Sequence, residues 1–103
     1  MLLNVLERIL LLQILPKESN LVTLRIAMGL SNNLSFTEKE FKDFSIVQLE
    51  NQTKWNPNIN TDTEIEIGEK ATDLIVDSLK KLNTENKLTA EHLTLCDKFK
   101  VEA

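Results

Sequence analysis

Two residues of this sequence, His92 and Cys96, are of the types best suited to bind a metal or to act as a nucleophile and its base. Because they are four positions apart, they would share one face of a helix. A structural zinc site needs four ligands, and the chain has no other histidine or cysteine. A Cys–His catalytic pair would also need an oxyanion donor set, which no part of the sequence marks. We therefore expect a half-buried cysteine, a surface histidine and no cofactor.

Phosphate and calcium chemistry are also unsupported. The chain has two glycines, Gly29 and Gly68, and two isolated glycines cannot form a phosphate-binding loop. A calcium loop starting at Asp62 would need glycine at its sixth position and glutamate at its twelfth. Gly68 falls one place late, and the twelfth position is Asp73. We expect no enzymatic activity.

Carboxylates concentrate between residues 62 and 77. We interpret them as a solvated acidic face, with an anionic patch for a basic partner as the alternative. Trp55, the only tryptophan, is expected to cap a hairpin onto the helices, with a binding role as the alternative. The candidate protein-contact residues are therefore Trp55, Glu64, Glu66, Glu69, Asp73 and Asp77.

Length and composition indicate one globular domain over residues 1–103. The net charge of −4 and the pI of about 5.0 argue against nucleic-acid binding, because phosphate recognition needs a basic face. One cysteine suits a reducing compartment, so we expect a cytoplasmic protein. The apolar N-terminal run is too short for a membrane span, and Glu7 and Arg8 interrupt it.

The first fifteen residues are apolar at nearly every position, up to Pro16. A helix that is apolar around most of its circumference is buried or spans a membrane. We expect a buried helix, capped by Asn4 and ended by Pro16, around which the other elements pack.

Caps and periodicity predict further helices over 20–31, 37–44, 68–83 and 89–100. Thr37 and Glu40 form a capping box, flanked by Phe36 and Phe41 as a hydrophobic staple. The second helix has two neighbouring apolar stripes, one of Leu21, Leu24 and Met28 and the next of Val22, Ile26 and Leu30. Their wide joint arc is expected of a helix that packs on the first. Gly29 in that helix suggests a close helix contact.

Residues 45–56 are predicted to form a hairpin. If Glu50 and Asn51 are its loop residues, Ile46 faces Trp55, and Asn51 can take a positive φ. Residues 63–67 alternate in polarity and either add a third strand or begin the next helix. The final helix should turn Leu93, either Cys96 or Leu95, and Phe99 inward. The fold expected is α+β and mainly helical: about five helices around the N-terminal one, with a small antiparallel hairpin or three-stranded sheet.

Helix, helix, short helix, hairpin over residues 4–56 resembles a winged-helix DNA-binding domain. That resemblance implies a recognition helix at 37–44 and a wing at 45–56. Nucleic-acid contacts would then come from Lys39, Lys42 and Lys54. The acidic residues of the same stretch outnumber these lysines, which argues against DNA.

Three segments resemble small bacteriophage- and prophage-encoded proteins: Glu7–Lys17 (ERILLLQILPK), Leu34–Glu40 (LSFTEKE) and Glu64–Leu82 (EIEIGEKATDLIVDSLKKL). The resemblance implies an accessory or inhibitor protein that binds a host, phage or defence protein, in the host cytoplasm if the chain is phage-encoded.

We therefore expect a non-catalytic protein-binding module. A homodimer through the first or last helix is also expected, because one short chain hides too little of the first helix. The alternatives are the winged-helix nucleic-acid binder and a small-ligand (nucleotide) sponge. The sponge would use a pocket between subunits lined by Arg8, Lys17 or Arg25.

Overall fold

The structure, a computed structural model, describes residues 1–101 and has the mainly helical α+β fold predicted. Its helices are α1 Val5–Ile14, α2 Leu21–Leu34, α3 Glu38–Asp43, α4 Glu69–Thr84 and α5 Leu93–Lys98, with a 3₁₀ turn η1 at Ala90–His92. Its strands are β1 Leu2–Leu3, β2 Val47–Gln48, β3 Thr53–Lys54 and β4 Thr63–Glu64. Each strand is two residues long, so the helices make up most of the fold.

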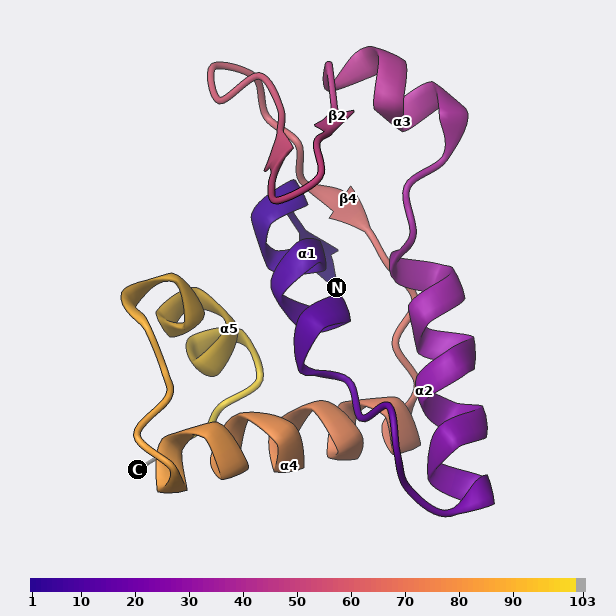
Figure 1. The fold of residues 1–103 in the computed structure, drawn as a ribbon, viewed down its shortest axis with the longest axis vertical. Helices are drawn as coiled ribbons and strands as arrows, with labels where there is room; N and C mark the ends of the chain where they lie inside the picture. Colours follow the sequence, from indigo (N-terminus) through magenta and orange to yellow (C-terminus); the bar gives the residue numbers. More distant parts are fainter. Residues whose placement is uncertain (102–103) are drawn as a thin grey trace.

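Helix α1 lies in the middle of the molecule (Figure 1), and α2 and α4 both pack against it and against each other. Its inward face is fully enclosed and supplies the centre of the core, as predicted. The buried core consists of Leu3, Leu10, Leu11, Leu15, Leu30, Leu34, Ile65, Ile75, Leu79, Leu95 and Phe99. The other face of α1 is less covered: Leu6, Ile9 and Leu12 are only partly buried and Gln13 is exposed.

Side-chain caps begin α1 and α3 at the residues predicted. The Asn4 side chain accepts a hydrogen bond from the Glu7 amide at 2.8 Å, and the Glu7 carboxylate accepts one from the Asn4 amide at 3.0 Å. Thr37 and Glu40 form the same reciprocal pair at the start of α3. Because Pro16 disfavours a helical conformation at Leu15, α1 ends there in extended backbone.

The strands within residues 1–101 form two separate two-stranded sheets: the predicted hairpin, and a second sheet that the sequence pattern did not predict. Thr63–Glu64 is a strand rather than the start of a helix, but it pairs antiparallel with Leu2–Leu3 and not with the hairpin. The Ile65 amide extends this pairing by donating to the Met1 carbonyl at 2.9 Å. The reason is burial: the pairing places Leu3 and Ile65 in the core beneath α1.

The hairpin of β2 and β3 has the predicted register. Val47 pairs with Lys54, which places Ile46 opposite Trp55 and leaves Glu50 and Asn51 at the turn. Asn51 does not take the positive φ expected of it; Ser45, Asn86 and Lys100 do.

Helix α2 is longer than predicted and continues to Leu34, because the buried Leu34 extends its inward face by one more turn. Gly29 faces solvent, and a Cβ there would meet nothing within 4 Å, so the predicted close contact is wrong. At the C-terminal end, Phe99 is buried as expected but Leu93 is 61% exposed. No helix within residues 1–101 is long and apolar enough to cross a bilayer.

Candidate functional site

Arg8, which the sequence suggested as a ligand-binding cation, is instead a buried structural residue, 1% exposed. Its guanidinium donates to the Leu34 carbonyl at 3.0 Å, to the Ser35 carbonyl at 2.8 Å and to both carboxylate oxygens of Glu40. The guanidinium carbon Cζ of Arg8 lies 4.3 Å from the centre of the Phe36 ring. The hydrogen bond from Arg8 lowers the pKa of Glu40 below its ordinary 4.5, against the opposing effect of burial. Arg8 therefore holds α3 and the end of α2 against α1.

Glu7 is the second buried charge of α1, also 1% exposed. Its Oε1 accepts a hydrogen bond from the Lys98 ammonium at 2.7 Å, and the same ammonium donates to the Leu2 carbonyl at 2.8 Å. Its Oε2 is buried without a hydrogen-bond partner within residues 1–101. The Lys98 contact thus attaches the C-terminal helix to the beginning of α1.

His92 and Cys96 do not form a reactive pair. His92 is buried, contrary to expectation, because its Nδ1 caps its own turn: it accepts from the Thr89 amide at 3.0 Å. Burial raises the pKa of the partly buried Cys96 thiol, and the charge of Asp97 raises it further. Since the thiolate is the nucleophile, this environment disfavours reactivity. Within residues 1–101 no three His, Cys, Asp or Glu side chains gather to hold a metal.

The candidate carboxylates are distributed over β4, the segment after it and α4, and all five are exposed. Glu64 forms an ion pair with the N-terminal ammonium at 2.7 Å. Asp73 and Asp77 line a shallow hollow between α2 and α4 together with Lys70. Trp55 lies apart from them, half-buried beside Leu6 of α1. The structure therefore does not unite these candidates into one site.

The three candidate nucleic-acid lysines are exposed. Lys39 is engaged with Asp43 of the same helix at 2.7 Å, and that hydrogen bond raises the pKa of Lys39. Lys42 lies on α3 beside Asp43, and Lys54 lies on β3. The acidic residues of α3 thus accompany its lysines in space as they do in sequence.

The periodicity of the sequence predicted that an apolar stripe of α2 packs against α1, but in the structure most of this stripe is exposed. Leu21 and Met28 are 63% and 70% exposed, and Leu24 between them is partly buried. We call Leu21, Leu24 and Met28 the α2 patch. It borders an open hollow of about 380 Å³ between α2 and the end of α1. Large apolar side chains gathered on a surface mark interaction sites more often than scattered ones do.

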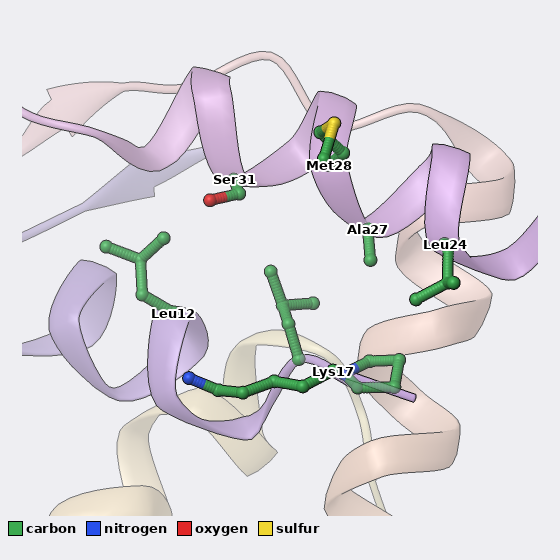
Figure 2. A pocket seen from close by; sticks show the side chains of 8 residues that line it. Leu12, Lys17, Leu24, Ala27, Met28 and Ser31 are labelled. Carbon is green, nitrogen blue, oxygen red and sulfur yellow. The ribbon is translucent and has the colours of Figure 1, made fainter. Parts of the chain in front are cut away.

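Figure 2 shows this hollow from close by. Leu12 of α1 points toward α2, and the opposite wall of the hollow is formed by Leu24, Ala27 and Ser31 of α2. Lys17 lies stretched along the α1 side, its aliphatic stem beside the apolar wall. Over residues 12–31 the charged residues are Lys17, Glu18 and Arg25, a net charge of +1 in a chain of net charge −4. The hollow and the patch together form an apolar surface with cations at its border.

No protein-family model, no curated protein and no solved structure matches this chain.

Proposed function

We propose that the protein is a non-catalytic protein-binding module that receives an apolar, acidic segment of its partner on the α2 patch. The exposure of Leu21 and Met28 beside an apolar hollow is the observation that carries the proposal. Apolar side chains of a partner would enter the hollow, and partner carboxylates would meet Arg25 and Lys17 at its border. Recognition of an amphipathic helix by an apolar groove follows the same arrangement.

The proposed module has no catalytic site. The two groups best suited to catalysis, His92 and Cys96, are a turn cap and a thiol of raised pKa. A nucleotide sponge is also a poorer description, because the guanidinium of Arg8 is occupied by Glu40 and two carbonyls. Arg25 is exposed on α2, and Lys17 alone of the three suggested cations lines a hollow.

The resemblance to phage-encoded proteins suggests the source of the partner. We propose a host or phage protein, met in the host cytoplasm, with the chain acting as an accessory or inhibitor. DNA binding through Lys39, Lys42 and Lys54 is disfavoured, because Asp43 engages the first of these lysines.

The test is affinity capture from the producing cells with matched variants. We expect the wild-type chain and the control Val22→Gln to retain the same protein, because Val22 is 65% exposed but lies outside the α2 patch. Leu21→Gln/Met28→Gln should lose it, with an affinity for the purified partner at least about tenfold weaker, since two contact residues are removed. Both substituted residues are exposed, so circular dichroism should be unchanged. Capture that is equal for all three proteins, or no specific capture, contradicts the proposal.

A further inference from the structure

The outward face of α1 is a second incompletely covered surface, which shares only Leu12 and Lys17 with the hollow beside the α2 patch. Leu6, Ile9 and Leu12 are partly buried on it and Gln13 is exposed. This outward face adjoins a series of hollows. The C-terminal hollow is lined by Ile9, Leu12, Gln13 and Lys17. The middle hollow shares Ile9 and Gln13 with it and adds Leu6 and Trp55. The N-terminal hollow shares Leu6 and Trp55 with the middle one. The hollows thus follow α1 over nearly its whole length.

Charge along this face is polarised. Lys17 lines the hollow at the C-terminal end of α1. Glu50 of the hairpin turn and Glu91 of η1 line the hollow beside Leu6, and Asp62 lines the one beyond it. A cation therefore borders the C-terminal end of the face, and the carboxylates border the rest of it, Glu50 and Glu91 at the middle hollow and Asp62 at the N-terminal one.

We propose that a second copy of this chain covers the outward face of α1, with the two α1 helices antiparallel about a two-fold axis near Ile9. In a two-fold interface each contact occurs twice, because the same patch serves both subunits. An antiparallel arrangement places Lys17 of each subunit at the acidic end of the other. Ile9 then meets Ile9 of the other subunit, and Leu6 of each subunit meets Leu12 of the other. The exposed Gln13 lies over the opposite apolar face.

The polarity of the charges favours a second copy over an unrelated partner. A face that is positive at one end and negative at the other complements itself after a half-turn. The length of the helix fits as well: α1 runs from Val5 to Ile14, ten residues or about 15 Å at the helical rise, which gives nearly three turns of contact, with Lys17 just beyond its end. Leu21, Leu24 and Met28 are not part of this interface, although Leu12 and Lys17 line the hollows of both surfaces. The inference goes beyond the proposed function and does not depend on it.

Sedimentation equilibrium of the purified full chain tests the dimer. We expect a monomer–dimer equilibrium that weakens as salt is added, because the end contacts are ionic. Lys17→Glu should raise the dimer dissociation constant at least about tenfold, and Glu50→Lys/Glu91→Lys should do the same, since each change sets like charges together at both ends of the interface. All three residues are exposed, so the fold should survive.

Mixing gives the decisive measurement. When Lys17→Glu is combined with Glu50→Lys/Glu91→Lys, opposite charges meet again at both ends, and a heterodimer of near wild-type strength should form. Leu21→Gln/Met28→Gln serves as the control and should dimerise normally. A chain that stays monomeric at high concentration overturns the inference, and so does a dimer that ignores the charge reversals or is lost in the α2-patch variant. The proposed function would stand in the first case if capture still depended on Leu21 and Met28.

Discussion

At the residue scale, the buried charges of α1 are the least ordinary feature of the protein. Glu7 and Arg8 are consecutive residues of the central helix, and each reaches a different distant element: Arg8 contacts Glu40 of α3, and Glu7 contacts Lys98 of α5. A buried charge is tolerated only where a countercharge and hydrogen bonds accompany it. These two side chains therefore specify where the peripheral helices lie.

Glu40→Gln tests the first pair. The amide keeps the capping role at α3 but removes the countercharge of the buried Arg8. We expect the free energy of unfolding at pH 7 to fall by about 3 kcal/mol, measured by urea denaturation. Glu38→Gln is the control: its residue is exposed on the same helix, and a change within about 0.5 kcal/mol is expected.

The same pair makes a prediction about pH. Because the pKa of Glu40 is lower in the folded protein than its ordinary 4.5, the unfolded chain binds the proton more readily. The stabilisation is complete above that pH and is lost as the pH falls through the lowered value. The stability gap between wild type and Glu40→Gln should therefore narrow below pH 4.5. A constant gap down to acid pH would show that the carboxylate charge is not responsible.

At the level of the elements, Gly29 destabilises α2, and no contact in the structure requires a glycine there. It lies in the helix interior, faces solvent, and has open space where a Cβ would be. Gly29→Ala should raise the free energy of unfolding by about 0.5–1 kcal/mol, seen as a higher thermal midpoint.

Gly68→Ala is the matched control for that change. Gly68 also has open space around it, but it is the N-cap of α4, where alanine is worse than glycine. We expect no stabilisation there. Equal gains at both glycines would mean that the effect arises in the unfolded chain rather than in helix α2.

Elements defined by local signals could be predicted, and those defined by distant ones could not. The capping boxes at Asn4 and Thr37 and the hairpin register depend on residues a few positions apart. The pairing of β1 with β4 joins residues about sixty positions apart, and nothing in the two-residue segment Leu2–Leu3 marks it as a strand. Only burial of the completed core selects that pairing.

At the scale of the whole molecule, periodicity assigned Leu21, Leu24 and Met28 to one face of α2 but could not say what covers that face. Within residues 1–101, five helices of this length enclose one side of α1 and one side of α2 and leave their other sides less covered. The candidate surfaces are what remains uncovered, and this depends on the arrangement of all the elements. For the same reason Lys17, Glu50 and Glu91 were not recognisable as one polarised face, because they come from three separate segments.

An ion pair joins the beginning of α1 to α5, and the last prediction concerns it. Lys98 of α5 is the counterion of the buried Glu7, whose second oxygen has no hydrogen-bond partner within residues 1–101. Lys98→Met should therefore cost about 3 kcal/mol in the free energy of unfolding, because it leaves a buried carboxylate uncompensated. Lys100→Met, a change of an exposed lysine two positions on, should cost little.

Glu7→Gln combined with Lys98→Met separates charge from packing. If the cost arises from the stranded carboxylate, the double variant should be more stable than Lys98→Met alone, since the buried charge is gone. The amide still accepts the hydrogen bond from the Asn4 backbone, so the cap of α1 survives. A coupling energy of at least about 1 kcal/mol in this double-mutant cycle is expected. If the stability losses of the two single variants simply add, the effect arises from contacts of the aliphatic stem of Lys98. In that case α5 is held against the beginning of α1 by packing rather than by the ion pair.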